Sequence, residues 1–255
     1  MILPTPSRIP KTALLCLAPL SLQAATVSLD NDDFASQNSG TNPGTLSSFT
    51  VGNNTNRLLV VTIAGEYTRS VDSVSFGTQS LTEAITSADP GGGPSKSSIW
   101  YLLAPDVGTA NITVNLGSTG SLNGYVIGAT SFYNVAQSGP LDVASDAGGS
   151  SGPSSLSYTI PTDAVIIEGM ETNDGGTART AQSGQTDYFT VSDSGNGGYR
   201  ASGAYEIVGP GDQSNNFGTM PGRFAYAGAV FAAVPEPSST ALGLLATVLL
   251  ARRRR

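Results

Sequence analysis

Short apolar segments separated by turn-forming residues are the feature of this sequence that most restricts its fold. Hydrophobic residues alternate with polar ones or run in short blocks, and Gly, Pro, Asn, Asp and Ser bound the blocks, which is typical of β-strands. The turns are dense, with PGGGP at 90–94 and NDGG at 173–176 as examples. No long amphipathic helix interrupts the pattern. The sequence therefore predicts an all-β protein, an antiparallel β-sandwich of jelly-roll or related topology.

Nine segments carry the clearest strand pattern. In the segment 109–116, Ile112, Val114 and Leu116 share one face and polar residues take the other, so one side of that strand should face solvent. The run 58–61 is apolar on both faces and should be central in its sheet. The nine predicted strands are 57–65, 71–76, 97–104, 109–116, 124–135, 163–172, 186–193, 200–209 and 223–234.

The first 25 residues have the three parts of a secretory signal. The cations Arg8 and Lys11 precede an apolar stretch from about residue 13 to 22, and the small residues Ala24 and Ala25 follow. The alternative, a buried helix or strand, conflicts with the four prolines of this segment, because each removes a backbone donor and fixes φ. We therefore expect export and cleavage near Ala24 or Ala25.

The last 22 residues, VPEPSSTALGLLATVLLARRRR, contain a triplet, an apolar segment and a basic end. The triplet is Pro235, Glu236 and Pro237, and the basic end is Arg252, Arg253, Arg254 and Arg255. This tail resembles the PEP-CTERM sorting signal of Gram-negative bacteria, also known as the ice-binding-protein C-terminal domain. The resemblance implies that a membrane-embedded exosortase, a transient partner, processes the chain near the triplet after export, commonly in organisms that make an exopolysaccharide matrix.

The physical properties of the tail suit a membrane anchor. The apolar segment runs from about residue 240 to 251, and as a helix it rises about 18 Å, less than the ~30 Å hydrocarbon core. Snorkelling arginines and local thinning of the bilayer make up part of the difference. The arginines favour a cytoplasmic C-terminus, which leaves the rest of the chain outside. The chain should thus comprise a signal peptide (1–25), a β-sandwich domain (26–233) and a sorting and anchor segment (234–255).

The charge distribution argues against some partners. Charged residues are only 12% of the chain, well below the roughly 25% of typical soluble domains. Six of the 12 Lys and Arg residues lie in the two end segments, so the central domain is strongly acidic. A negative field repels nucleic acid and anionic lipid. We therefore expect no nucleic-acid partner, and membrane contact only through the C-terminal segment.

Few residues of this chain could perform catalysis. There is no histidine, and the only cysteine, Cys16, lies in the apolar stretch of the signal, where Leu15 before it does not suit lipidation. Ser/His and Cys/His pairs and zinc sites of His/Cys type are therefore excluded. A glycosidase-like carboxylate pair could come from Glu66, Glu168 and Glu171, which lie at or near predicted strand ends. Solvated strand-end charges are the commoner explanation, so we expect no enzyme and no catalytic residue.

Acidic and aromatic side chains offer two further kinds of site. Asp30, Asp32 and Asp33, and Asp142 with Asp146, could supply oxygen ligands to calcium, but no strict calcium spacing is present. We therefore expect no metal and no cofactor. Trp100 and Tyr101 are neighbours on one strand and point to opposite faces, and core packing is expected for Trp100. The aromatic candidates for sugar stacking near predicted loops are Tyr67, Tyr188 and Tyr199.

The central part also resembles a known module. The segments LLVVTIAGE, VDSVSFGTQSLTEA and IWYLLAPDVGTANITVNL, with RFAYAGAVFAAV as a closing strand, are similar to a β-sandwich module of secreted bacterial proteins. That resemblance implies the fold and no particular activity. The sequence thus favours an exported cell-surface or extracellular-matrix protein with a structural or adhesive role. A carbohydrate-binding module acting on exopolysaccharide stays open as the alternative.

Overall fold

The described part of the chain consists of strands joined by loops. The computed structural model describes residues 26–148, 152–173, 180–182, 184–193, 199–220 and 222–235. These ranges contain no helix, and therefore none long and apolar enough to cross a membrane. Their strands are β1 (Ser28–Asn38), β2 (Gly44–Val51), β3 (Leu58–Tyr67), β4 (Val71–Phe76), β5 (Gln79–Ser80), β6 (Thr82–Ala88), β7 (Ser95–Leu103), β8 (Gly108–Leu116), β9 (Leu122–Tyr133), β10 (Asp142–Gly148), β11 (Gly152–Ile160), β12 (Ala164–Asn173), β13 (Thr186–Ser192), β14 (Arg200–Val208), β15 (Gly211–Met220) and β16 (Arg223–Ala232).

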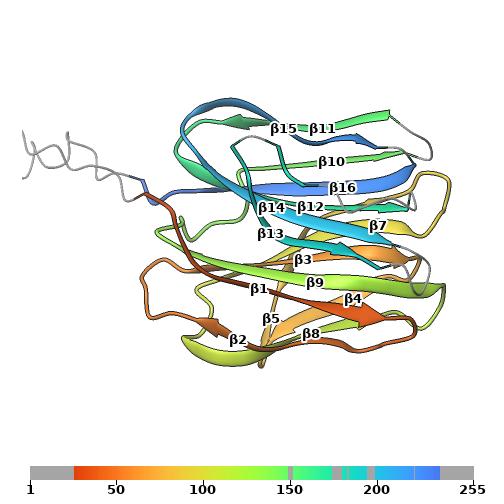
Figure 1. The fold of residues 1–255 in the computed structure, drawn as a ribbon. Helices are drawn as coiled ribbons and strands as arrows, with labels where there is room; N and C mark the ends of the chain where they lie inside the picture. The colour runs from red at the N-terminus through yellow and green to blue at the C-terminus, as the bar shows by residue number, and fades with distance from the viewer. Residues whose placement is uncertain are drawn as a thin grey trace, which may run out of the picture. The chain divides into compact units, whose positions relative to one another are not determined.

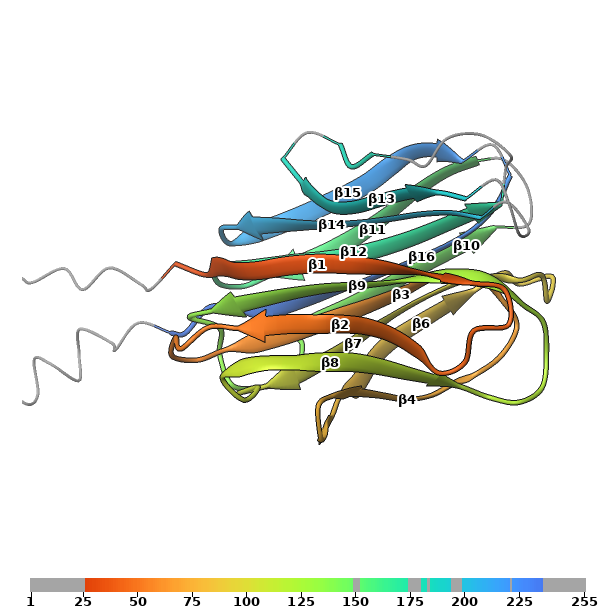
Figure 2. The ribbon, with the colours of Figure 1, turned by 60° about the horizontal axis from the view of Figure 1, so that its bottom comes forward.

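The strands form four stacked antiparallel sheets (Figures 1 and 2). Inner sheet 1 has the order β1-β9-β3-β7-β6, and inner sheet 2 has the order β10-β16-β12-β14-β13. The two inner sheets pack face to face, because β12 and β16 contact β3, β6 and β7. Outer sheet 1 (β2-β8-β4-β5) covers the other face of inner sheet 1, and outer sheet 2 (β11-β15) covers inner sheet 2. The predicted antiparallel β-sandwich class is confirmed, as two sandwiches back to back.

Three apolar layers lie between the four sheets. The inner faces of β3 and β12 meet in the central layer, which includes Val60 and Ile167. The opposite faces of the same strands pack against the outer sheets, and Val61 and Ile166 are examples. Both strands are therefore covered on both sides, which explains why their sequences lack the alternation of a half-exposed strand. The prediction that 58–61 is central in its sheet is confirmed.

The two sandwiches share one topology. In the first sandwich (β1–β9) the strands β1, β9, β3, β7 and β6 follow one another across the inner sheet. In the second (β10–β16) the corresponding order is β10, β16, β12, β14 and β13, and β11-β15 corresponds to β2-β8. Only β4 and β5 have no counterpart among the described strands. The domain is therefore an architectural duplication, which sequence inspection did not reveal.

The predicted strands all occur, but one has a different place from that expected. The segment 223–234 was expected to close the module formed by the earlier strands. It forms β16, which pairs with β10 and β12 of the second sandwich and occupies the position that β9 has in the first. This difference follows from the duplication, because each sandwich has its own closing strand.

Both ends of the domain leave it at the same place (Figure 1). The Asn134 side-chain amide donates to the Thr26 carbonyl at 3.1 Å, and the Val234 amide donates to the Asn134 carbonyl at 3.0 Å. We call this the terminal end. Ten-residue strands such as β3 and β12 lead from it to the opposite, distal end, about 30 Å away. All the described residues, from 26 to 235, belong to one compact unit.

Candidate functional site

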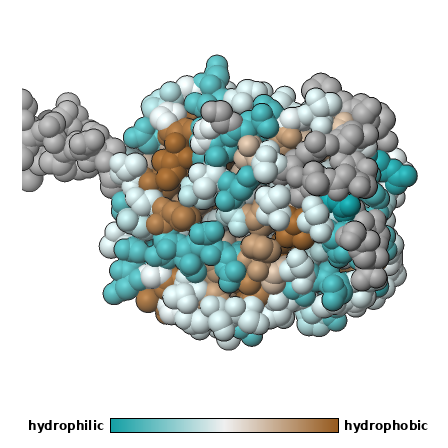
Figure 3. Space-filling view, in the orientation of Figure 1, coloured by the Kyte–Doolittle hydropathy of each residue, from teal (hydrophilic) through white to brown (hydrophobic). Residues whose placement is uncertain are grey.

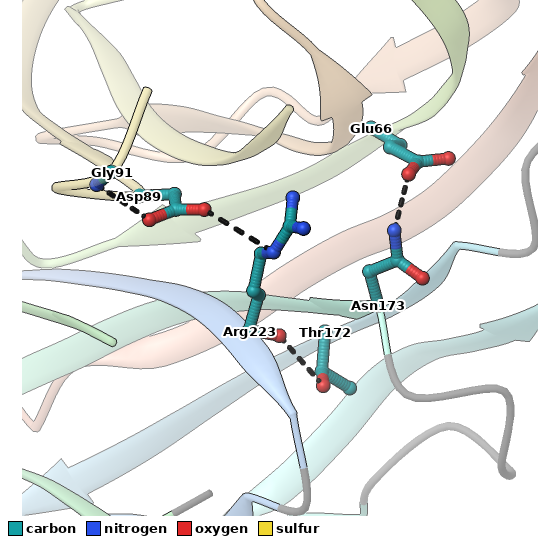
Figure 4. A network of polar contacts seen from close by, with 6 residues as sticks. All are labelled: Glu66, Asp89, Gly91, Thr172, Asn173 and Arg223. Carbon is teal, nitrogen blue, oxygen red and sulfur yellow. Dashed lines mark hydrogen bonds and ion pairs between the residues drawn. The ribbon is translucent and has the colours of Figure 1, made fainter. Parts of the chain in front are cut away.

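A cluster of charged and amide side chains lies at the distal end, where the two inner sheets meet (Figure 4). Glu66 is the penultimate residue of β3, Asn173 ends β12 and Arg223 begins β16. Asp89 follows β6, in the loop to β7. Strand register brings these residues together, because Asn173 pairs with Arg223 and Glu66 pairs with Ser95 near that loop. We call Glu66, Asp89, Asn173 and Arg223 the distal cluster.

Glu66 is the most enclosed acid of the distal cluster. Its residue is 4% exposed, and the Asn173 side-chain amide donates to its Oε1 atom. Burial raises the pKa of the Glu66 carboxyl, while the Asn123 amide and the positive charge of Arg223 oppose that shift. Polar groups from both sandwiches therefore compensate for the burial of Glu66.

Asp89 and Arg223 form a second contact in the distal cluster. Arg223 Nε lies 3.8 Å from Asp89 Oδ2, and Asp89 Oδ1 accepts from the Gly91 amide at 2.8 Å. A Cβ atom on Gly93 would lie 2.1 Å from Asp89 Oδ2 and 2.8 Å from Arg223 Nη1. Gly93 is thus required for the loop to pass so close to this ion pair. The glycine-rich turn predicted at 90–94 holds Asp89 in place.

The distal cluster joins the two sandwiches. Glu66 and Asp89 belong to the first sandwich, and Asn173 and Arg223 belong to the second, so both contacts cross the central layer. The Arg223 side chain is 50% exposed, whereas that of Asp89 is 2% exposed. The arrangement can therefore fasten the two halves and still present one guanidinium group to solvent.

The three carboxylates considered for catalysis do not form one group. Glu168 and Glu171 are three residues apart on β12, and side chains on a strand alternate between its faces. Glu168 faces outer sheet 2, where Tyr158 donates to it, whereas Glu171 pairs with Ala201 of the central layer. Glu66 also points to the central side, toward Asn173. Glu168 is therefore separated from the other two by its own sheet.

Asp30 and Asp142, two of the aspartates considered for calcium, make structural contacts. Asp30 accepts from the Gly52 amide at 2.8 Å, from Ser131 Oγ at 2.9 Å and from the Asn54 amide at 3.0 Å, and so fastens β1 to the loop after β2. Asp142 accepts from the Thr159 amide at 3.1 Å. Within the described ranges, no three His, Cys, Asp or Glu residues gather closely enough to hold a metal ion.

The aromatic candidates for sugar stacking are buried. Tyr67 and Tyr199 are fully enclosed and Tyr188 is 6% exposed, so none of the three offers the exposed ring that sugar stacking requires. Trp100 is 7% exposed, which confirms core packing. Among the described residues, Phe34, which is 43% exposed, is the one aromatic residue that is largely open to solvent. The face in Figure 3 is a mosaic of small hydrophobic patches divided by hydrophilic residues. The part of the chain that the structure describes therefore forms no exposed aromatic row.

The predicted sorting residues lie mostly outside the described ranges. Pro235 is described and exposed, whereas Glu236, Pro237 and residues 252–255 are not among the described residues, nor is the predicted signal 1–25. Sequence inspection did not identify Asp89, Asn173 and Arg223 as a group. The glycine-rich turn beside Asp89 was the one local signal, and it marked a loop without naming its partners.

Comparison of the chain with models of protein families, with curated proteins and with solved structures finds no match.

Proposed function

We propose that this chain is an exported protein of the cell surface or extracellular matrix, sorted through its C-terminal segment, with a structural or adhesive role. The signal-like first 25 residues and the tail from Val234 to Arg255 motivate the proposal. The strongly acidic character of the central domain and its lack of cysteine and histidine are consistent with it.

The observation that best supports this role is the common exit of both chain ends. Thr26 and Val234 both contact Asn134, so a tail held at a membrane leaves the terminal end of the domain nearest to the bilayer. The distal cluster then lies about 30 Å further out. A domain that is anchored at one end and presents the Arg223 guanidinium group at the other suits contact with neighbouring matrix components.

The layered core suits a load-bearing scaffold. Three apolar layers are enclosed between four sheets, and buried apolar area contributes roughly 25 cal/mol per Å² to folding. The domain holds no cysteine, so its stability comes from packing and hydrogen bonds and does not depend on the redox state outside the cell.

The sorting part of the proposal is tested by intact mass and localisation in a host with a matching exosortase. We expect the mature protein at the cell surface or in the matrix to lack the apolar segment and Arg252 to Arg255. The prolines around Glu236 favour an extended peptide beside the bilayer, where a membrane protease can bind it. The six Leu and Val residues of the apolar segment give only about 3 kcal/mol of insertion energy, so the anchor is marginal without processing.

Replacement of Pro235, Glu236 and Pro237 by alanine should abolish this processing. The matched control replaces Ser238, Ser239 and Thr240 by alanine in the same segment and should be processed normally. Arg255 retained on fully localised wild-type protein, or unchanged localisation of the first variant, would contradict sorting. A polysaccharide pull-down with the same protein separates the adhesive role from carbohydrate binding.

A further inference from the structure

A carboxyl group is enclosed in the apolar layer between β12 and outer sheet 2. Glu168 is fully buried, and its neighbours on the same face of β12 are Ile166 and Met170. Leu156 of β11 and Phe217 of β15 belong to the same apolar cluster. An acid in such a layer has lost its contact with water, and burial disfavours its charged form.

Hydrogen bonds join Glu168 to each element that covers it. Tyr158 of β11 donates to Oε1 at 2.8 Å, and the Asn215 amide of β15 donates to Oε2 at 3.4 Å. The Gln185 amide, in the segment before β13, also donates to Oε2. One carboxyl group therefore connects inner sheet 2 with both strands of outer sheet 2.

The titratable groups that face Glu168 carry no positive charge. Tyr158 faces it from β11, Tyr226 from β16 and Glu206 from β14. Burial raises the pKa of both tyrosines, so they stay neutral between pH 5 and 8. Among the described residues no Lys or Arg forms an ion pair with Glu168. The negative charges of two further acids also raise the pKa of these tyrosines: Asp142 acts on Tyr158, and Asp146 acts on Tyr226.

Ionisation of Glu168 works against the closed layer. Burial raises the pKa of its carboxyl to about 7, and donation from Tyr158 and Asn215 opposes this shift. Because the pKa of Glu168 is higher in the closed state, protonation of this carboxyl stabilises closure. This stabilisation is fully present below pH 4.5, the ordinary pKa of the group, and is lost as the pH rises through about 7. The closed layer is thus favoured in acid and weakened above neutral pH.

The first sandwich has no equivalent group. The same face of β3 carries Leu59, Val61 and Ile63, all apolar, and outer sheet 1 has four strands. Outer sheet 2 has only β11 and β15, and two strands alone are marginally stable in water. The titratable Glu168 therefore lies under outer sheet 2, which has fewer strands than outer sheet 1.

We propose that Glu168 is a protonation-controlled latch: its neutral carboxyl is compatible with β11 and β15 closed over inner sheet 2, and its ionisation, because a charge requires water, favours the opening of this two-stranded layer. The opening concerns the second sandwich and leaves the first sandwich closed.

The test is amide hydrogen exchange of the purified full chain at pH 5 and pH 8, corrected for the intrinsic effect of pH on exchange. We expect protection of β11 and β15 to fall roughly ten- to a hundredfold at pH 8, since the shift spans about 2.5 pKa units. The corresponding strands β2 and β8 serve as the internal control and should keep their protection. In Glu168→Gln, the protection of β11 and β15 should no longer fall at pH 8. Glu83→Gln is the control, because it changes an exposed acid of β6, and in this variant the fall in protection should persist.

Two results would overturn the latch. One is the same loss of protection in Glu168→Gln, and the other is an equal loss in β2 and β8 of the wild type. If Glu168→Gln does not fold, the wild-type profile between pH 5 and 8 decides, because the latch requires a midpoint near 7 confined to β11 and β15. A profile that is flat over this interval rejects it.

Discussion

Gly169 marks a point in the central layer where the two inner sheets lie very close together. Gly169 of β12 faces Thr62 of β3, and a Cβ atom on Gly169 would lie 2.2 Å from Thr62 Cγ2. The Gly169 carbonyl also accepts from Ser97 Oγ at 2.8 Å across the same layer. Close packing of this kind tolerates added volume poorly, because neither backbone can move without disturbing its own sheet.

We therefore expect Gly169→Ala to destabilise the domain by about 1 to 3 kcal/mol. The control, Gly139→Ala, changes an exposed glycine whose Cβ would lie 3.3 Å from the hydroxyl of Tyr101, and it should stay within about 0.5 kcal/mol. Thermal unfolding followed by circular dichroism measures both. Equal melting temperatures for the two variants would show that the central layer can expand.

At the scale of strands, the ends of β3 and β12 are joined by side chains of unequal burial. Glu66 is enclosed and receives its amide donor from Asn173, whereas the enclosed Asp89 faces the half-exposed Arg223 at 3.8 Å and keeps the Gly91 amide as a donor. A buried acid that loses its amide donor retains the cost of desolvation, while an ion pair at this distance, with its cation half in water, contributes little. The amide contact should therefore fasten the two sandwiches more strongly than the ion pair does.

Asn173→Ala should lower the free energy of unfolding by about 1 to 3 kcal/mol. Asn115→Ala is the matched control, because Asn115 is exposed and donates to Ser73 Oγ at 3.0 Å, and it should change stability by less than about 0.5 kcal/mol. Urea unfolding at pH 7 gives both values. A loss for Asn173→Ala no larger than that of its control would show that Glu66 obtains its solvation elsewhere.

Across the whole domain, the central apolar layer links two units of the same topology. Leu58 and Phe132 from the first sandwich pack with Val165 and Phe231 from the second, so separation of the halves would expose this layer to water. Each sandwich alone would bear a large apolar face. The two are therefore expected to fold and unfold together.

The isolated segment 26–235 should be a monomeric β-rich protein with one unfolding transition at pH 6. Trp100 is the only tryptophan and lies in the first sandwich, so its fluorescence follows that half, while circular dichroism follows both. Coincident curves are expected. Two separate midpoints would show that the central layer does not couple the sandwiches.

The local pattern of apolar and polar residues was enough to predict many of the strands and the burial of their side chains. Alternation in 109–116 correctly predicted that Ile112 and Val114 are buried and Asn111 exposed, and the apolar run 58–61 correctly predicted a central strand. Such patterns are readable because each side chain's face follows from its neighbours along the strand. Strands β1, β10 and β15 escaped detection because they lie at sheet edges or on the outside and carry mostly polar residues.

Only the tertiary structure decided how the strands assemble and which polar groups meet. Glu66 and Asn173 are 107 residues apart, and Glu168 meets Asn215 across 47 residues, so no local signal could pair them. Glu66, Glu168 and Glu171 looked equivalent in the sequence, as acids near strand ends. They differ in the structure because each occupies a particular face of its strand and a different sheet covers that face. The burial and the hydrogen-bond donors that shift a carboxyl pKa come from segments distant in the chain.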